Sequence, residues 1–439
     1  MQTLYLATNF NPVYWNTAYL IVNSGAVDEE DGDTTDYTKI AKAIGAIRSA
    51  GIKVSLADIN NSDFGFKPDV ENNQILFGLK GLLNVGDDVV ADIIKNRPYA
   101  SIKDFCNRVP VKRQSMISLI KGGAFDNLHP EGRKFIMAWY IWETCDKKKR
   151  ITLQNMNGLM SRGLIPREEK FELPSRIYEF TRYLKTVCKA GNDAYKLDDR
   201  ATNFIIELGL EDACDYPFLK VKDWDGIYQS YMNVFRDWMK EKQEEILNEL
   251  NTAIFKEEWD KYALGSLSAW EMEVLCFYYH DHELKDVNVG KYGIVDFNSL
   301  TEEPLIERTF EKNGKTINMF KLSKICGTCI AKNKTKSTVS LLTPSGVVEV
   351  KFRKEYFAMF DKRISKRQPD GTKKIVEKSW FDRGNMIMVQ GIRSGDTFIT
   401  KKYASSGGHQ LYKISEISRE GDLTLRNTRV QGDEEESEI

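Results

Sequence analysis

Along the first two-thirds of the chain, apolar residues recur mainly at helical spacing. The pattern predicts helices over residues 2–23 and 37–51, two short strands over 52–59 and 73–79, and amphipathic helices from 131 to about 275. The longest apolar-periodic run spans 228–263, and its aromatic side chains are typical of a buried core rather than of a cofactor site.

From about residue 316 the apolar period changes to two, which predicts strands. One short helix, 354–364, is predicted between the third and fourth strands. The five strand candidates span 317–332, 336–343, 346–353, 385–394 and 396–403. This order is that of a five-stranded Greek-key barrel. The predicted fold class is therefore multidomain α+β, with a mostly α-helical first two-thirds followed by an OB-fold β-barrel.

Two helical hairpins are predicted between these regions. In the first, an apolar run breaks at Asn84-Val85-Gly86, and an acidic pair then opens a new helix. The second has a short helix beginning at Ser101, with Asp104 as a variant of the capping box, and a helix over 112–128 that ends at Gly122-Gly123.

The first hairpin resembles a helix-hairpin-helix DNA-binding motif. Small residues at such a turn allow the backbone amides of the next helix to approach a phosphate. Gly86 fills the second small position, and Asn84, which tolerates positive φ well, fills the first. Asp87 and Asp88 suit the helix dipole but compete with a phosphate. A DNA contact and a purely structural turn both remain open here.

Charge is distributed unevenly along the chain. The net charge is −1, but residues 320–403 contain 19 Lys or Arg against 7 Asp or Glu, so this segment carries +12. Such segregation indicates a module that faces a polyanion, although the lysine-rich stretch 361–378 is also compatible with a solvated loop.

The sequence contains no run apolar enough to span a membrane and no signal peptide at its beginning. Seven cysteines, an odd number spread thinly, favour a reducing cytoplasm. The predicted location is therefore cytoplasmic.

Three patterns that could carry metal or redox chemistry are better explained as structure. The acidic stretch 27–36 lacks the spacing of a calcium loop, and Cys326 and Cys329 lie within a strand candidate without a second ligand pair. His280 and His282 have no suitably spaced carboxylates. No nucleophile motif, phosphate-binding loop or paired catalytic aspartates occur. No catalytic residue and no metal site is predicted in this chain.

The order of several segments resembles the C-terminal half of the family C replicative DNA polymerases, the alpha subunits of bacterial DNA polymerase III. The segments are "LYLATNFNPVYWNTAYLIVNSG", "GIKVSLADINNSDFGF", "ILFGLKGLLNVGDDVVADII", "YASIKDFCNRV", "LIKGGAFDNL" and "AWEMEVLCFYYHDHEL". The resemblance covers roughly residues 2–128 and 268–403.

The resemblance implies a domain order that the chain follows. The expected domains are the end of the fingers domain (1–70), a tandem helix-hairpin-helix region (71–130), a helical region with an insertion (131–275), a connector (276–315), the OB fold (316–425) and an acidic tail (426–439). The family's palm, with its catalytic aspartates, has no counterpart here. Mg²⁺ and dNTPs are therefore expected on a partner polypeptide that carries the palm.

The resemblance also names candidate DNA-binding residues. The family hairpin reads Lys-Gly-Val-Gly, so Leu83 and Asn84 depart from it. The expected duplex contacts are Lys80, Asn84, Val85, Gly86, Lys95, Arg97, Lys112, Arg113, Lys121, Gly122 and Gly123. The expected single-strand contacts on the barrel are Lys332, Lys334, Lys336, Lys351 and Arg353, whereas Phe352 shares the parity of core residues.

Family members also carry a sliding-clamp-binding peptide. Its nearest candidate has poor spacing and comprises Gln154, Met156, Leu159 and Met160. The leading hypothesis is a non-catalytic, DNA-holding chain of a split polymerase. A truncated piece of a polymerase, a free-standing nucleic-acid-binding or scaffold protein of the replication machinery, and a clamp-recruiting accessory remain as alternatives.

Overall fold

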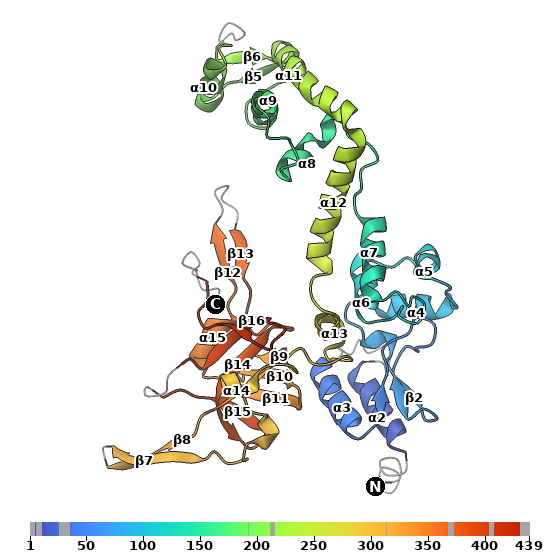
Figure 1. Cartoon of the computed structure of the whole chain (residues 1–439), viewed down its shortest axis with the longest axis vertical. Coiled ribbons are helices and arrows are strands. Elements are labelled where there is room, and N and C mark those ends of the chain that lie inside the picture. Colours follow the sequence, from blue (N-terminus) through green and yellow to red (C-terminus); the bar gives the residue numbers. More distant parts are fainter. Residues whose placement is uncertain are drawn as a thin grey trace. The chain divides into compact units, whose positions relative to one another are not determined.

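The computed structural model describes residue 5 and residues 11–25, 36–191, 193–210, 216–312, 314–367, 373–403 and 408–430. The chain divides into two compact units (Figure 1): residues 1–137 with 265–439 form unit 1, and residues 138–264 form unit 2. Among the described residues, no helix has the length and apolar character needed to cross a membrane.

Unit 1 begins with two helices, α2 (Pro12–Asn23) and α3 (Tyr37–Ser49). Asp36 caps α3 by accepting a hydrogen bond from the Lys39 amide at 3.1 Å. The chain leaves the helix through Gly51, whose φ of +80° explains the glycine at this position. A small sheet follows, in which β3 (Gln74–Leu76) pairs in parallel with β1 (Lys53–Val54) and antiparallel with β2 (Lys67–Asp69).

The helical hairpins follow this sheet. Their elements are η1 (Leu79–Gly81), α4 (Asp87–Lys95), α5 (Ile102–Arg108) and α6 (Arg113–Lys121), and α7 (Arg133–Thr144) comes next. As predicted, Ser101 begins α5 by accepting from the Asp104 amide at 3.1 Å. Asp104 completes the cap by accepting from the Ala100 amide at 3.1 Å, one residue before the position that a regular capping box uses.

The loop between β1 and β2 joins the small sheet to the hairpins. The Asn60 side chain donates to the Tyr99 carbonyl at 2.9 Å and accepts from the Tyr99 amide at 2.8 Å. The amide of Ile59 donates to the Ala124 carbonyl at 2.8 Å. These reciprocal bonds fix the stretch around "LADINNSDFGF" against the hairpins.

The second part of unit 1 is a closed five-stranded barrel. Its strands are β9 (Ser323–Asn333), β10 (Thr338–Thr343), β11 (Gly346–Lys351), β14 (Met386–Ser394) and β15 (Thr397–Thr400), and α15 (Lys354–Asp361) lies between β11 and β14 in sequence. The ring runs β9-β10-β11-β15-β14 and closes through β14–β9, with only β11–β15 parallel. The predicted OB barrel is therefore confirmed.

The barrel closes at a glycine. Gly391 pairs with Ser323 of β9 and also with Thr400 of β15. A Cβ atom at Gly391 would lie 2.1 Å from the carbonyl oxygen of Ile399. Only glycine allows β14 to approach both neighbours so closely, which is a common role of glycine at barrel corners.

Several elements differ from the predicted pattern. The strand candidate 317–332 is two strands, β8 (Lys315–Phe320) and β9, because β8 pairs with β7 (Ile306–Lys312) in a separate hairpin. Two further pairs were not predicted. They are β12 (Ile364–Arg367) with β13 (Lys373–Glu377), and β16 (Leu411–Ile417) with β17 (Leu423–Arg426).

Short helical segments and one packing contact complete unit 1. The segments are α13 (Leu267–Leu275), α14 (Val289–Tyr292) and η4 (Phe297–Ser299). A buried cluster joins residues of α3 and α13 to the barrel; its members are Ala41, Met272, Tyr278, Ile330 and Leu342. The helices α3 and α13 and the barrel therefore share apolar contacts within unit 1.

Unit 2 is helical with one small sheet and its own core. Its elements are η2 (Leu153–Asn155), α8 (Met156–Ser161), α9 (Glu169–Thr186), β4 (Lys189–Ala190), β5 (Ala194–Lys196), α10 (Asp199–Glu207), β6 (Phe218–Lys220), α11 (Val221–Glu241) and α12 (Gln243–Tyr262). The single helix predicted over 228–263 is thus two helices, which break at Lys242. Phe235 and Trp238 lie in the core of this unit, as predicted.

Candidate nucleic-acid interface

Two helices of the hairpin region begin without a side-chain cap. Gly86 precedes α4 and Lys112 precedes α6, and neither provides a capping hydrogen bond. In contrast, Ser101 caps α5. The first amides of a helix have no acceptor within the helix, and the dipole makes this end positive. The starts of α4 and α6 are therefore suited to an anionic ligand such as a backbone phosphate.

The first hairpin is fixed to α6 by two hydrogen bonds. The Ser115 hydroxyl donates to the carbonyl oxygen of Asn84 at 2.6 Å, and Asn84 Nδ2 donates to Ser118 Oγ at 3.3 Å. Asn84 has a φ of 62°, so the left-handed conformation expected of it is confirmed. Gly86 is extended, with φ of −79°. The departure from glycine at residue 84 therefore leaves the hairpin intact and adds a tether between the two hairpins.

A cavity of about 560 Å³ lies between the starts of the two helices. Its lining residues are Tyr37, Lys80, Leu82, Asn84, Val85, Gly86, Asp88, Val89, Pro110, Lys112, Gln114 and Ser115. Five of the residues expected to contact DNA thus line one cavity; they are Lys80, Asn84, Val85, Gly86 and Lys112. Tyr37 was missed because it belongs to α3, and no local pattern connects it with a hairpin almost fifty residues later.

The charges at this cavity are mixed. Lys80 Nζ forms an ion pair with Asp87, which reduces the charge that it offers to a ligand. Asp88 also lines the cavity and would repel an anion. Lys112 is exposed and has no ion-pair partner among the described residues. Lys112 is therefore the cation best placed to contact a phosphate here.

Other expected duplex contacts have structural roles. Lys121 is buried and pairs with Glu273 at 2.5 Å. Arg97 donates from Nε to the carbonyl oxygen of Ile59 at 2.7 Å and also to that of Ser62. Burial lowers the pKa of the Arg97 guanidinium. Neither side chain is free to bind DNA in this fold, which corrects the expectation for both.

The remaining members of that set do not line the cavity. A Cβ atom at Gly122 would lie 2.5 Å from Leu82 Cδ2, and Gly123 has a φ of +80°. The glycine pair is thus required for packing against the first hairpin and for ending α6. Lys95 is exposed at the end of α4, and Arg113 is half-buried at the start of α6.

The barrel lysines are not equivalent. Lys332 Nζ lies 2.5 Å from Asp361 Oδ1 and 2.8 Å from Asp382 Oδ1, so its charge is neutralised internally. The remaining barrel candidates, which are Lys334, Lys336, Lys351 and Arg353, are exposed. Phe352 is a core residue, and base stacking on it is excluded in this fold.

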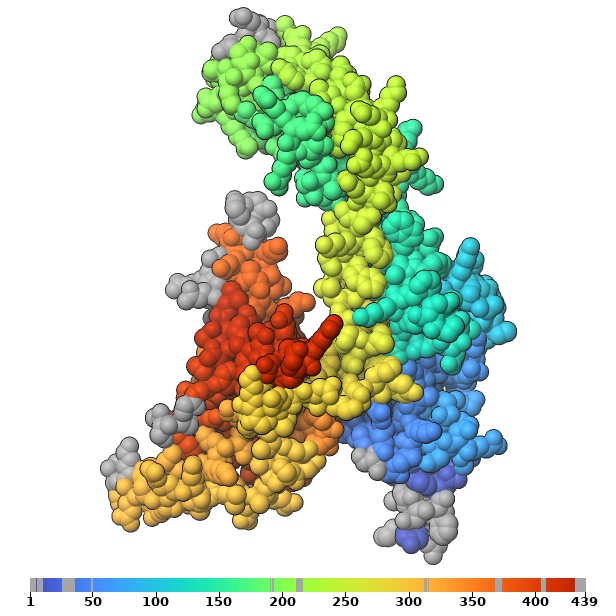
Figure 2. All heavy atoms as spheres, in the orientation of Figure 1, coloured from blue at the N-terminus to red at the C-terminus, as the bar shows by residue number. Residues whose placement is uncertain are grey.

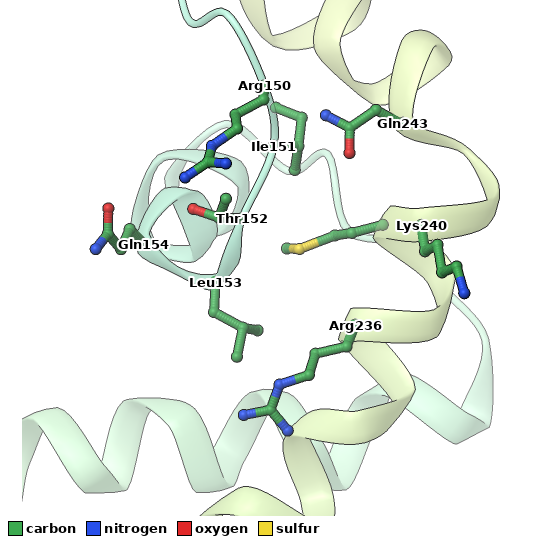
Figure 3. A pocket seen from close by; sticks show the side chains of 9 residues that line it. Arg150, Ile151, Thr152, Leu153, Gln154, Arg236, Lys240 and Gln243 are labelled. Atoms are coloured by element: carbon green, nitrogen blue, oxygen red, sulfur yellow. The ribbon is translucent and has the colours of Figure 1, made fainter.

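The clamp-peptide candidate is incorporated into the core of unit 2. Met156 and Leu159 are fully buried, and Met160 packs against the same core. A linear binding peptide must present its apolar side chains to a partner, so this segment does not offer one. Gln154 borders a separate cavity of about 580 Å³ in unit 2, where its side chain points away from α11 and α12 (Figure 3).

The cysteine and histidine pairs contact groups within the chain. Cys326 and Cys329 are buried on β9 in two different apolar clusters, and burial raises the pKa of Cys326 to about 12. His280 Nδ1 lies 2.6 Å from the buried carboxylate of Glu271, and His282 Nε2 lies 2.9 Å from the carbonyl oxygen of Leu342. The described residues contain no group of three potential metal ligands.

Comparisons with known proteins point to DNA polymerases. A model of the helix-hairpin-helix motif matches residues 51–135. The probable DNA polymerase YorL of Bacillus subtilis (strain 168) and the DNA-directed DNA polymerase of Bacillus phage SPbeta are each 38% identical over 98% of the chain. The match covers 34% of each relative, so the chain spans about a third of their length.

DNA polymerase III alpha subunits match a shorter part of the chain. The Thermus aquaticus subunit is 36% identical over 132 residues, which are 28% of this chain and 10% of that protein. These shorter matches cover the helix-hairpin-helix region. The chain is thus similar along almost its whole length to about a third of two DNA polymerases, and its helix-hairpin-helix region is similar to part of the DNA polymerase III alpha subunits.

Proposed function

We propose that this chain is the DNA-holding part of a replicative DNA polymerase whose catalytic palm is on another polypeptide. The observation that carries this proposal is the pair of uncapped helix starts, α4 and α6, that Asn84 and Ser115 hold together at one cavity. Amides at two fixed helix starts offer two sites for backbone phosphates, where a single helix start offers one.

In this proposal the hairpins bind duplex DNA and the barrel binds the single-stranded template. The exposed barrel cations, Lys334, Lys336, Lys351 and Arg353, would follow the phosphates of the single strand. Lys332 is left out of this set because two aspartates already neutralise it. Mg²⁺ and dNTPs would be bound by the palm-bearing polypeptide.

The surface of α2 supports the existence of a protein partner. This helix contains no charged residue, and its exposed face is formed by Tyr14, Trp15, Ala18, Tyr19 and Val22. Tyr14 is 54% exposed and Val22 is 61% exposed. Exposed aromatic side chains without charges are typical of the centre of a protein interface. In this proposal we assign this face to the palm-bearing polypeptide.

Reconstitution tests the proposal. The chain alone is expected to bind primed DNA without incorporating nucleotides, and incorporation is expected when the palm-bearing polypeptide from the same genome is added. Robust incorporation by the isolated chain would contradict the division of labour. DNA binding without any association with that polypeptide would instead support a free-standing nucleic-acid-binding protein.

A further inference from the structure

The strands β12 and β13 form a ribbon that pairs with no other described strand. The ribbon stands out from the barrel in Figure 1, and Figure 2 shows its atoms projecting in the same way. It occupies the lysine-rich stretch for which the sequence is also compatible with a solvated loop. Four of the seven cations of this stretch, Lys366, Arg367, Lys373 and Lys374, are therefore held on two paired strands.

The pairing places like charges opposite one another. Lys366 pairs with Lys374, and Arg367 pairs with Lys373. Residues directly opposite in a sheet lie on the same face, and successive residues lie on opposite faces. Each face of the ribbon therefore presents a pair of cations. All four side chains are exposed, and like charges directly opposite destabilise an isolated ribbon.

The two carboxylates near the base of the ribbon have other partners. Glu377, at the base of the ribbon, is buried and accepts from Trp380 Nε1 at 2.8 Å and from Arg429 Nε at 3.2 Å. Asp361, before the ribbon, pairs with Lys332. Asp370 lies outside the described residues. Glu377 thus anchors the base of the ribbon, and the four cations concentrate positive charge beyond it.

We propose that this ribbon binds in a groove of duplex DNA, with phosphates on both sides of it. The inference rests on the proposed function, because it adds a third contact to a DNA-holding chain. A two-stranded ribbon fits the major groove of B-DNA, which is about 12 Å wide. Cations on both faces match the two phosphate backbones that border a groove. A single strand would engage one face, and the described strands contain no aromatic side chain for base stacking.

Edge protection is the alternative explanation for these cations. Lysine on exposed strands prevents pairing with another chain. This explanation predicts that removing the charges leaves DNA binding unchanged and causes self-association. The two explanations therefore predict different results for the same variant.

The test uses the full chain with Lys366→Gln, Arg367→Gln, Lys373→Gln and Lys374→Gln combined. Affinities for a 30-base-pair duplex and for the corresponding single strand are measured by fluorescence anisotropy between 50 and 300 mM NaCl. The salt slope of duplex binding should fall by roughly 0.9 for each phosphate that is no longer neutralised, or by about 3 to 4 for four phosphates. Duplex affinity at 50 mM salt should fall at least about tenfold, and single-strand affinity should change much less.

A matched control removes four exposed cations of unit 2, with Lys149→Gln, Lys189→Gln, Lys196→Gln and Lys222→Gln. It should leave the duplex slope nearly unchanged. A second variant, with Lys366→Arg, Lys373→Arg and Lys374→Arg, keeps the charge and should retain binding. Circular dichroism and sedimentation confirm that each variant is folded and show its oligomeric state.

The possible results separate the two proposals. If the wild-type chain binds duplex and the ribbon variant binds equally well, the ribbon inference is overturned and the proposed function stands. An equal loss in the unit 2 control would also overturn it, because the effect would then be one of net charge. If the wild-type chain does not bind duplex DNA at all, both proposals fail.

Discussion

Asn84 determines the shape of the first hairpin and its attachment to α6. Its φ of 62° is in the left-handed region, where a side chain costs about 1–2 kcal/mol unless it is Gly, Asn or Asp. Its side-chain amide also donates to Ser118. A residue that departs from the polymerase III pattern therefore supports the hairpin in a different way.

We expect Asn84→Val to lower the free energy of unfolding by about 1–3 kcal/mol, because a β-branched side chain is strained at positive φ. Asn84→Gly should cost less than about 1 kcal/mol, since it keeps the backbone and removes one neutral hydrogen bond. Urea denaturation followed by circular dichroism measures both. Equal stability of the two variants would show that φ at residue 84 is not the constraint.

Arg133 forms ion pairs with two carboxylates, those of Asp126 and Glu271. It donates from Nη1 to the fully buried Glu271 at 2.9 Å, and from Nε to Asp126 Oδ2 at 2.8 Å. Glu271 also accepts from the amides of Tyr279 and His280. The buried carboxylate thus connects the hairpin region to the segment after α13.

Arg133→Met should destabilise unit 1 by about 3–5 kcal/mol, because it leaves the Glu271 carboxylate buried without its cation. The double variant Arg133→Met with Glu271→Gln should recover part of this loss, since it removes the uncompensated charge. The free energy of unfolding, measured for both variants, tests the predicted loss and its partial recovery. A neutral effect of the single variant would mean that His280 and the backbone amides of Tyr279 and His280 are sufficient partners for the Glu271 carboxylate.

The helix α6 shows how two lysines of one element differ in role. Lys112 precedes its first turn at the cavity and is exposed, whereas Lys121 in its last turn is buried against Glu273. Both belong to the basic set that the sequence associates with DNA. Only their burial and partners distinguish a ligand-facing cation from a structural one.

We expect Lys112→Ala to reduce the salt slope of duplex binding by about one, as for the loss of a single phosphate contact. Lys121→Ala should leave that slope unchanged and lower stability instead. Lys103→Ala, at an exposed lysine of α5, is the matched control. The assignment of Lys112 fails if its variant and the Lys103 variant bind duplex equally.

At the same scale, η2 and α8 show why a peptide motif can mislead. Gln154, Met156 and Leu159 belong to the nearest candidate for a clamp-binding peptide, which has poor spacing, and apolar residues one helical turn apart also form a buried face. Met156→Ala and Leu159→Ala should each cost about 2–5 kcal/mol, measured by thermal or urea unfolding. A loss of clamp binding without a loss of stability would restore the peptide hypothesis.

For the molecule as a whole, the face of α2 predicts how a polymerase would be assembled. Trp15→Lys combined with Tyr19→Lys should weaken association with the palm-bearing polypeptide by at least about 30-fold, because central aromatic residues contribute about 2 kcal/mol or more. Both side chains are about 40% exposed, so the fold should be retained. Isothermal titration calorimetry measures the association, and duplex binding through the hairpins serves as the control. Unchanged association would show that the α2 face does not bind the palm-bearing polypeptide.

Short stretches of sequence are enough to predict the mostly helical first two-thirds and the fold of the barrel. Period and turn chemistry act locally, so the change from helical to strand periodicity, the Ser101 cap, Gly51 at the end of α3 and the left-handed Asn84 are all visible in such stretches. The alternation of buried residues along β11 likewise predicts that Phe352, which follows this strand, points inward.

The availability of each cation to a ligand depends instead on the three-dimensional fold. Lys121, Arg97 and Lys332 look like exposed basic residues in sequence, but each is neutralised or bound by groups far away in the chain. The same holds for the ribbon of β12 and β13, whose charge becomes concentrated only because the strands pair Lys366 with Lys374. Ion pairs and cross-strand register are long-range contacts, and a local pattern of residue types does not specify them.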